Sequence, residues 1–92
     1  MRYIWYEAKR AANRTVHGID FTTAERFGWD TATVAPDARH NYGEDRFVAL
    51  GRIDARIHVL VFTLRGGLVR IISLRKANRR EVRRYEESQT ES

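Results

Sequence analysis

A run of arginines near the C-terminus is the strongest chemical signal in this sequence. Residues 75–84 contain six basic side chains and one acidic one, in a chain with 17 Lys and Arg against 12 Asp and Glu. Guanidinium groups bind phosphate oxygens through paired hydrogen bonds. The run therefore predicts binding to a polyanion. A solvated helix face and a surface that docks an acidic protein remain as alternatives.

The spacing of the residues assigns the basic side chains to two elements, a strand and the helix that follows it. The alternating pattern of 68–76 predicts a strand, with Val69, Ile71, Ser73 and Arg75 on one face and Arg70, Ile72, Leu74 and Lys76 on the other. Arg75 would then lie at a strand end, where it binds phosphate or forms a structural ion pair. On the helix that follows, residues four apart share one side, which gives two basic stripes, Arg79 with Arg83 and Arg80 with Arg84.

Three further side chains are candidates for proton transfer or phosphate contact. His17 ends a predicted helix, where it could act as an acid or base or cap the last carbonyls. Lys9, on the same helix, could contact phosphate or pair with a nearby Glu. Tyr85 could be a general acid or a platform for a base, or it could belong to the core.

The polar loop at 37–45 holds the remaining candidates. Glu44 could serve as a base, although pairing with Arg46 is the simpler role, and His40 lies in the same loop. His58 is interpreted as a core histidine because it lies in an apolar strand, and Trp5 and Trp29 are assigned to packing.

The elements that must position these residues follow from local patterns. Strands are predicted at 2–6, 29–36, 46–52, 58–64 and 68–76, the last three as an antiparallel meander. A helix is predicted at 7–17 with an apolar stripe (Ala8, Ala11, Ala12, Thr15, Val16) and a stop at Gly18. Capping boxes predict a short helix after Thr22 and a last helix after Asn78. The fold class is α+β, with a small antiparallel sheet of about four strands, two N-terminal helices and one C-terminal helix.

Length and composition limit the possible classes of protein. Ninety-two residues form one small domain, expected at 1–87 and followed by a frayed polar tail at 88–92. The absence of cysteine excludes disulfides and thiolate chemistry. The longest apolar run is four residues, and no signal-peptide pattern is present, so the cytoplasm is expected.

Several segments together resemble the BrnT toxin family. They are residues 5–9, Asn13, His17-Gly18, Phe21, the loop 37–46 with Tyr42-Gly43-Glu44, and above all the segment 70–77 followed by Glu81 and Tyr85. In that family the residue after Trp5 is usually acidic, whereas here it is Tyr6. The resemblance implies a RelE-like ribonuclease fold that arrests growth by cutting RNA. It also implies a BrnA-like antitoxin partner of the ribbon-helix-helix type, and a possible homodimer within a toxin–antitoxin heterotetramer.

The residues are compatible with RNA cleavage that uses neither metal nor cofactor. The acidic residues are dispersed, whereas two-metal cleavage needs carboxylates gathered around the ions. A base, an acid and phosphate-directed cations would suffice. The candidates are Arg75, His17, Lys9, Tyr85 and Glu44 for catalysis, and Lys76, Arg79, Arg80, Arg83, Arg84 and Arg46 for RNA binding. The alternative is a non-catalytic module that binds nucleic acid or the antitoxin through the arginine stripe.

Overall fold

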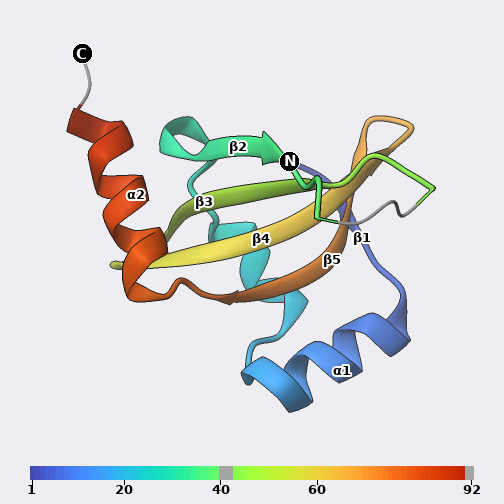
Figure 1. Cartoon of the computed structure of the whole chain (residues 1–92). Coiled ribbons are helices and arrows are strands. Elements are labelled where there is room, and N and C mark those ends of the chain that lie inside the picture. Colours follow the sequence, from blue (N-terminus) through green and yellow to red (C-terminus); the bar gives the residue numbers. More distant parts are fainter. Residues whose placement is uncertain (40–42, 91–92) are drawn as a thin grey trace.

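The computed structural model describes residues 1–39 and 43–90, so the loop residue His40 lies outside the described part. One mixed sheet has the strand order β1-β5-β4-β3-β2, with helices on both faces (Figure 1). In chain order the elements are β1 (Tyr3–Ile4), α1 (Glu7–His17), η1 (Phe21–Arg26), η2 (Trp29–Thr31), β2 (Thr33–Pro36), β3 (Phe47–Ile53), β4 (Arg56–Arg65), β5 (Leu68–Lys76) and α2 (Arg79–Thr90), where η denotes a 3-10 helix.

The predicted α+β class and the meander are confirmed, but the sheet is larger than predicted and is not purely antiparallel. β2, β3, β4 and β5 pair antiparallel in order, and β1 adds a fifth strand parallel to β5. This parallel pair involves only two residues of each strand, Tyr3 with Val69 and Ile4 with Arg70. The rest of the outer edge of β5 is left for α1.

A bulge in β5 changes which side chains share a face. Val61 pairs with Ser73 and Phe62 pairs with Ile71, so Ile72 is an extra residue in the register. The strict alternation predicted for 68–76 is therefore wrong beyond Ile72. Arg70, Ile72 and Arg75 belong to one face, while Val69, Ile71, Leu74 and Lys76 belong to the other.

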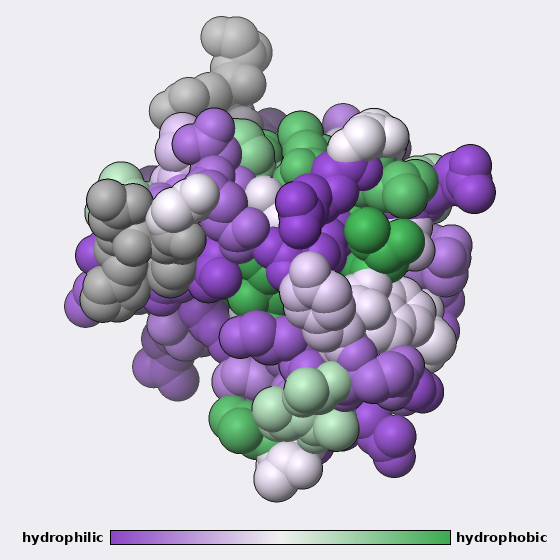
Figure 2. Space-filling view, turned by 90° about the vertical axis from the view of Figure 1, so that its right-hand side faces the viewer, coloured by the Kyte–Doolittle hydropathy of each residue, from purple (hydrophilic) through white to green (hydrophobic). Residues whose placement is uncertain are grey.

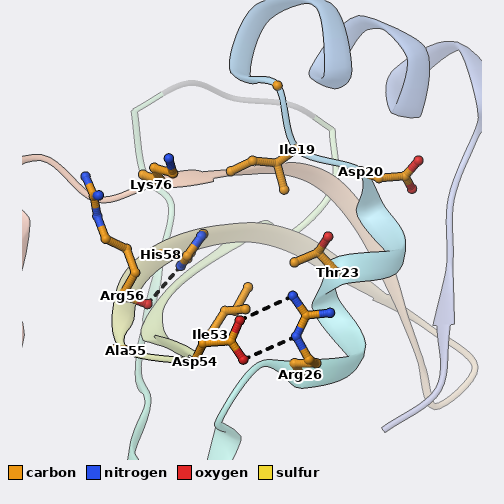
Figure 3. Close-up of a pocket in the computed structure, with 11 residues that line it drawn as sticks. Ile19, Asp20, Thr23, Arg26, Ile53, Asp54, Ala55, Arg56, His58 and Lys76 are labelled. Atoms are coloured by element: carbon orange, nitrogen blue, oxygen red, sulfur yellow. Dashed lines mark hydrogen bonds and ion pairs between the residues drawn. The ribbon is translucent and has the colours of Figure 1, made fainter.

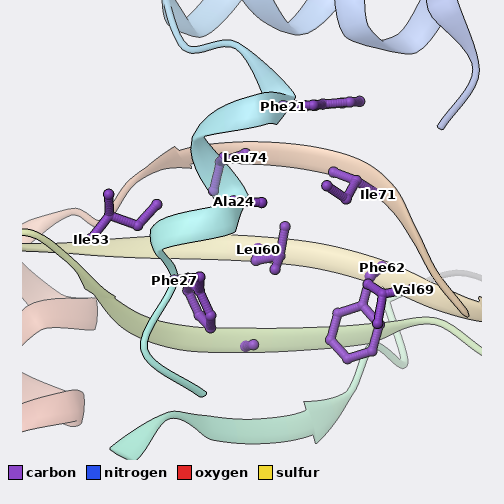
Figure 4. Packing of buried hydrophobic residues seen from close by; sticks show 10 residues of the cluster. Phe21, Ala24, Phe27, Ile53, Leu60, Phe62, Val69, Ile71 and Leu74 are labelled. Carbon is purple, nitrogen blue, oxygen red and sulfur yellow. The ribbon is translucent and has the colours of Figure 1, made fainter. Parts of the chain in front are cut away.

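The first face of the sheet carries the larger core, over which η1 lies (Figure 4). Phe21 and Ala24 are fully buried there, and Phe27 packs so closely on Gly51 that an added Cβ would lie 2.5 Å from its ring. The short helix predicted after a Thr22 cap is a 3-10 helix that begins at Phe21, two residues earlier than predicted. Its cap is Asp20, whose carboxylate accepts from Thr22 N at 3.0 Å.

The second face is covered only in part, by α2. Tyr85 and Val82 pack there on a cluster that includes Leu50, Val59 and Ile72. The predicted capping box is confirmed, because Glu81 N donates to Asn78 Oδ1 and Asn78 N donates to Glu81 Oε1. α2 continues to Thr90, so residues 88–90 of the predicted frayed tail are helical. In the described residues, no helix has the length and apolar character needed to span a bilayer.

α1 contacts the sheet differently from its sequence pattern. The residues of the predicted apolar stripe are all exposed, and the one buried residue of the helix is Asn13. Its side-chain amide donates to Leu74 O at 2.8 Å and accepts from Leu74 N at 3.0 Å, which occupies the edge of β5. It also donates to Ile19 O at 3.0 Å. One polar side chain thus joins α1 to the sheet.

Replacing Asn13 by Ala should destabilise the protein by about 1–3 kcal/mol, because the buried N–H and C=O of Leu74 would lose their partners. The free energy of unfolding in urea measures the effect. Asn13→Asp should also destabilise, since a carboxylate accepts from Leu74 N but cannot donate to Leu74 O. Thr15→Ala, at an exposed position of the same helix, is the control and should stay within about 0.5 kcal/mol of wild type. A wild-type stability for Asn13→Ala would contradict this role.

Candidate functional site

Lys9 and His17 line one shallow hollow beside β5. The hollow has a volume of about 190 Å³, and Ile72 and Ser73 of the bulge form its other wall. Residues 9, 12, 13, 16 and 17 of α1 face it together, the spacing of one helix face. Lys9 and His17 are exposed, so both can reach a bound molecule.

Two arginines of β5 lie on either side of this hollow. Arg70 and Arg75 share the second face because of the bulge, and their partners on β4, Thr63 and Val59, are four residues apart, or roughly 13 Å along a strand. The hollow opens at Ile72 and Ser73 between them. Two arginines of β5 and a lysine and a histidine of α1 thus lie along the same stretch of β5.

Arg70 belongs to a cluster with Glu44 and Arg46. Its Nη2 donates to both carboxylate oxygens of Glu44, at 2.7 and 2.8 Å, while Arg46 Nε donates to Glu44 Oε2 at 3.1 Å. The Tyr6 ring lies 4.9 Å from the guanidinium carbon of Arg70. Arg70 Nε is buried and has no hydrogen-bond partner among the described residues. The cluster therefore contains two cations for one carboxylate.

These contacts decide the role of Glu44. The hydrogen bond from Arg46 lowers the pKa of the Glu44 carboxyl, and the charge of Arg70 adds to this, although burial opposes it. A carboxylate with a lowered pKa is a weak base near neutral pH. The pairing of Glu44 with Arg46, one of the two roles considered from the sequence, is confirmed.

The cluster lies on the side of the molecule that carries β1, the segment before β3 and the β4–β5 turn. Figure 2 shows that this side is mostly hydrophilic, with small hydrophobic areas between the charged residues. Exposed apolar side chains here include Ile4 and Tyr6. Ile4 pairs with Arg70 in the sheet, and the Tyr6 ring lies over the guanidinium of Arg70. Aromatic and apolar groups beside arginines suit a ligand with both bases and phosphates.

Arg75 forms the ion pair that was the alternative to phosphate binding. Its two Nη atoms donate to the two carboxylate oxygens of Glu81, both at 2.8 Å. Its side chain is still 31% exposed. It lines a groove of about 480 Å³ whose floor is apolar (Val48, Leu50, Val59, Val61) and whose rim includes Arg39 and Arg84. Arg75 is thus held in a fixed direction at the rim of this groove.

The remaining candidate residues lie in different environments in the structure. Tyr85 is 1% exposed and its hydroxyl donates to Thr31 Oγ1, which favours the core interpretation over a role in catalysis. Arg79, Arg80 and Arg83 are exposed on α2 and make no ion pair with any described residue. Lys76 points to the first face, away from Arg75.

Sequence reasoning missed two members of the site, Arg70 and Tyr6. Strict alternation separated Arg70 from Arg75, and nothing local marks the bulge that brings them together. A signal was available for Arg70, because a charged residue within an otherwise apolar strand needs a partner. That partner, Glu44, is 26 residues away in the sequence.

These features define a small basic α+β protein with arginines, a lysine and a histidine along one partly uncovered sheet face. The chain belongs to the family of ribonuclease toxins, BrnT, of type II toxin–antitoxin systems, whose model matches residues 5–81. No curated protein matches the chain. The family indicates an RNA target and an antitoxin partner.

Replacing Glu81 by Gln should destabilise the protein near pH 7, and the difference from wild type should shrink as the pH falls below the ordinary range of a carboxyl. Arg75 lowers the pKa of Glu81 in the folded state. A carboxyl group whose pKa is lower in the folded state than in the unfolded state stabilises the fold at pH values above its unfolded pKa. This stabilisation is lost as the pH falls through the pKa of the folded state. Urea unfolding of wild type and variant at about pH 7 and about pH 3 measures the loss of stability at each pH.

Glu86→Gln is the matched control for Glu81→Gln, since Glu86 is exposed on the same helix and has no ion pair with a described residue. It should leave the stability nearly unchanged at both pH values. A destabilisation by Glu81→Gln that is equal at both pH values would mean that the charge of Glu81 is not what stabilises the fold.

Proposed function

We propose that this chain is a metal-independent endoribonuclease toxin that cleaves RNA and so inhibits translation and growth. The observation that carries the proposal is the hollow shared by Lys9, His17 and Ser73 between Arg70 and Arg75. In this proposal an RNA strand lies along β5 on the second face of the sheet.

Each requirement of metal-free cleavage has a candidate on this face. Arg70 and Arg75 neutralise phosphates on either side of the hollow, as donors directed at developing charge do in phosphoryl chemistry. His17 moves the proton at the 2′-hydroxyl or at the departing 5′-oxygen, and Lys9 supplies positive charge next to it.

Metal independence is supported by what the carboxylates already bind. Glu44, Glu81 and Asp20 each accept hydrogen bonds from an arginine at 2.7–3.1 Å. Their oxygens are therefore engaged by guanidinium groups. The positive charge that a metal would bring to the phosphate is supplied here by arginine.

The partner proposed for this toxin is a BrnA-like antitoxin of the ribbon-helix-helix type, within a heterotetramer that contains two toxins. The family membership supports an antitoxin in general, and the resemblance supports this type. The proposal includes a RelE-like classification of the fold and action in the cytoplasm, where translation takes place.

The wild-type chain, purified without antitoxin, should cleave single-stranded RNA in the presence of EDTA. His17→Gln should slow this cleavage by about 10²-fold or more, because a positioned acid or base contributes roughly that factor. Single-turnover rates on a labelled RNA measure the effect, and growth arrest after induction should weaken in parallel.

Thr15→Ala, exposed on the same helix outside the hollow, should cleave at the wild-type rate and is the control for His17→Gln. Cleavage that stops in EDTA and returns with magnesium would refute metal independence. Equal rates for His17→Gln and wild type would remove His17 from the site.

A second candidate function is a non-catalytic module that binds nucleic acid or the antitoxin through α2. The observation that favours it is the exposure of Arg79, Arg80 and Arg83 without ion pairs among the described residues. Like charges four residues apart on a helix repel, and an anionic partner would relieve this repulsion.

Replacing Arg79 and Arg83 together by Gln should flatten the salt dependence of RNA binding. Each phosphate contact contributes a slope of about −0.7 in log K against log salt for a single strand, so the change is one to two such units. A titration by fluorescence anisotropy at several salt concentrations measures it, with Arg2→Gln/Arg65→Gln as a control of equal charge. An unchanged slope together with weaker antitoxin binding would assign the stripe to the antitoxin.

A further inference from the structure

A second pocket lies on the first face of the sheet, between the end of α1, η1 and the β3–β4 turn (Figure 3). Its volume of about 430 Å³ is within the range of small-molecule sites. The polar side chains that line it are three cationic ones, two carboxylates, a histidine and a threonine, namely Arg26, Arg56, Lys76, Asp20, Asp54, His58 and Thr23.

His58 presents a hydrogen-bond acceptor to this pocket. The residue is 6% exposed, and its Nδ1 lies 2.9 Å from Arg56 O. Because a carbonyl oxygen only accepts, Nδ1 carries the hydrogen, and Nε2 of the neutral ring is then an acceptor. Nε2 has no hydrogen-bond partner among the described residues. The assignment of His58 as a satisfied core histidine therefore holds for one ring nitrogen only.

The neutral state of this ring has a physical cause. Burial lowers the pKa of His58, and the charges of Arg56 and Lys76 lower it further, while the hydrogen bond to Arg56 O and the charge of Asp54 act in the opposite direction. The ring is therefore neutral near pH 7, with a lone pair on Nε2.

Positive charge surrounds this acceptor. Lys76 is the register partner of His58 in the sheet, and Arg56 lies two residues before it on the same strand. Neither makes an ion pair with a described residue. Figure 3 shows the third cation, Arg26, joined to Asp54 at 3.4 Å, and Asp20 is engaged by Arg10. Two cations without an ion pair to a described residue thus lie beside one acceptor that faces the pocket.

We propose that this pocket binds a ribose 3′-phosphate, with Lys76 and Arg56 on the phosphate and His58 Nε2 accepting a hydrogen bond from the adjacent 2′-hydroxyl. A simple anion such as sulfate would satisfy the cations but offers no donor to Nε2. A ribonucleotide carries a hydroxyl donor next to its anion, as the pocket requires. The ligand is either the 3′ end of an RNA or a free mononucleotide.

This site is separate from the one proposed for cleavage. The bulge directs Lys76 to the first face and Arg75 to the second, so the sheet lies between the two sites. Binding here does not require that the chain cleaves RNA. A binding experiment therefore tests it independently of the proposed ribonuclease activity.

The test compares adenosine 3′-monophosphate with its 2′-deoxy analogue by calorimetry on the full chain. The ribonucleotide should bind about fivefold to tenfold more tightly, since the deoxy analogue leaves Nε2 without a donor. The ¹⁵N signal of His58 Nε2 should shift with the ribonucleotide only. Lys76→Gln should weaken both ligands by a similar factor, whereas Arg2→Gln, of equal charge change, should weaken neither.

Two variants of His58 separate its role from a general effect on the fold. His58→Gln keeps an acceptor and should keep part of the preference for ribose, whereas His58→Phe should lose it. If His58→Phe does not fold, the wild-type comparison and the His58 signal still decide. Equal affinity for the two nucleotides, or an unmoved His58 signal on binding, would overturn the proposal.

The source of the ligand is resolved by a third probe. An oligonucleotide of 2′-O-methyl nucleotides that ends in one ribonucleotide 3′-phosphate cannot be cut within its body. Binding that shifts the His58 signal and exceeds that of the mononucleotide identifies an RNA end as the ligand. A shift with the mononucleotide alone identifies the free nucleotide, and no shift with either probe overturns the proposal.

Discussion

The amide of Asn13 fixes where α1 lies, and the site on the second face depends on that position. β1 covers only Val69 and Arg70 at the outer edge of β5, and the Asn13 side chain supplies the donor and the acceptor that the next strand would have supplied to Leu74. An edge left with unpaired backbone groups would be costly to bury. Because the helix is anchored at this point, its residues four before and four after Asn13 face the bulge of β5. A mainly exposed helix can therefore hold functional side chains in a defined place.

The bulge in β5 determines how the charged residues of this strand are divided between the two faces of the sheet. Ordinary alternation separates Arg75 from Lys76, and the bulge brings Arg70 to the face of Arg75. The basic run at 75–84 is consequently not one surface. Arg75 and Arg84 line the groove on the second face, Lys76 lines the pocket on the first, and Arg79, Arg80 and Arg83 are exposed on α2. A single dense run of positive charge in the sequence thus supplies three separate surfaces.

Most features that depend on a few neighbouring residues were predicted from the sequence, except the cap of η1, which is Asp20 and not Thr22. Features that depend on distant contacts were not predicted. The Asn78–Glu81 capping box, the stop of α1 at Gly18 and the meander turns are set within about four residues. The contact of Asn13 with Leu74 spans 61 residues, so no local pattern reveals it. The alanines of α1 suggested an apolar contact face, but alanine also favours a helix that remains exposed. The sequence supplied the candidate residues, while their division between two faces of the sheet required the structure.

Tyr6 makes the charge at Arg70 different from what an acidic residue at that position would give. Arg70 and Arg46 both donate hydrogen bonds to the carboxylate of Glu44, so this carboxylate is not a partner of Arg70 alone. An acidic side chain at position 6 would lie near the guanidinium of Arg70 and cancel that charge. The aromatic ring instead lies over the guanidinium at 4.9 Å and attracts it without adding negative charge. The buried Nε–H of Arg70 also stays without an acceptor in the described residues. In this chain Arg70 is therefore held in place by Glu44 and Tyr6, and it contributes positive charge to this face rather than an accessible donor.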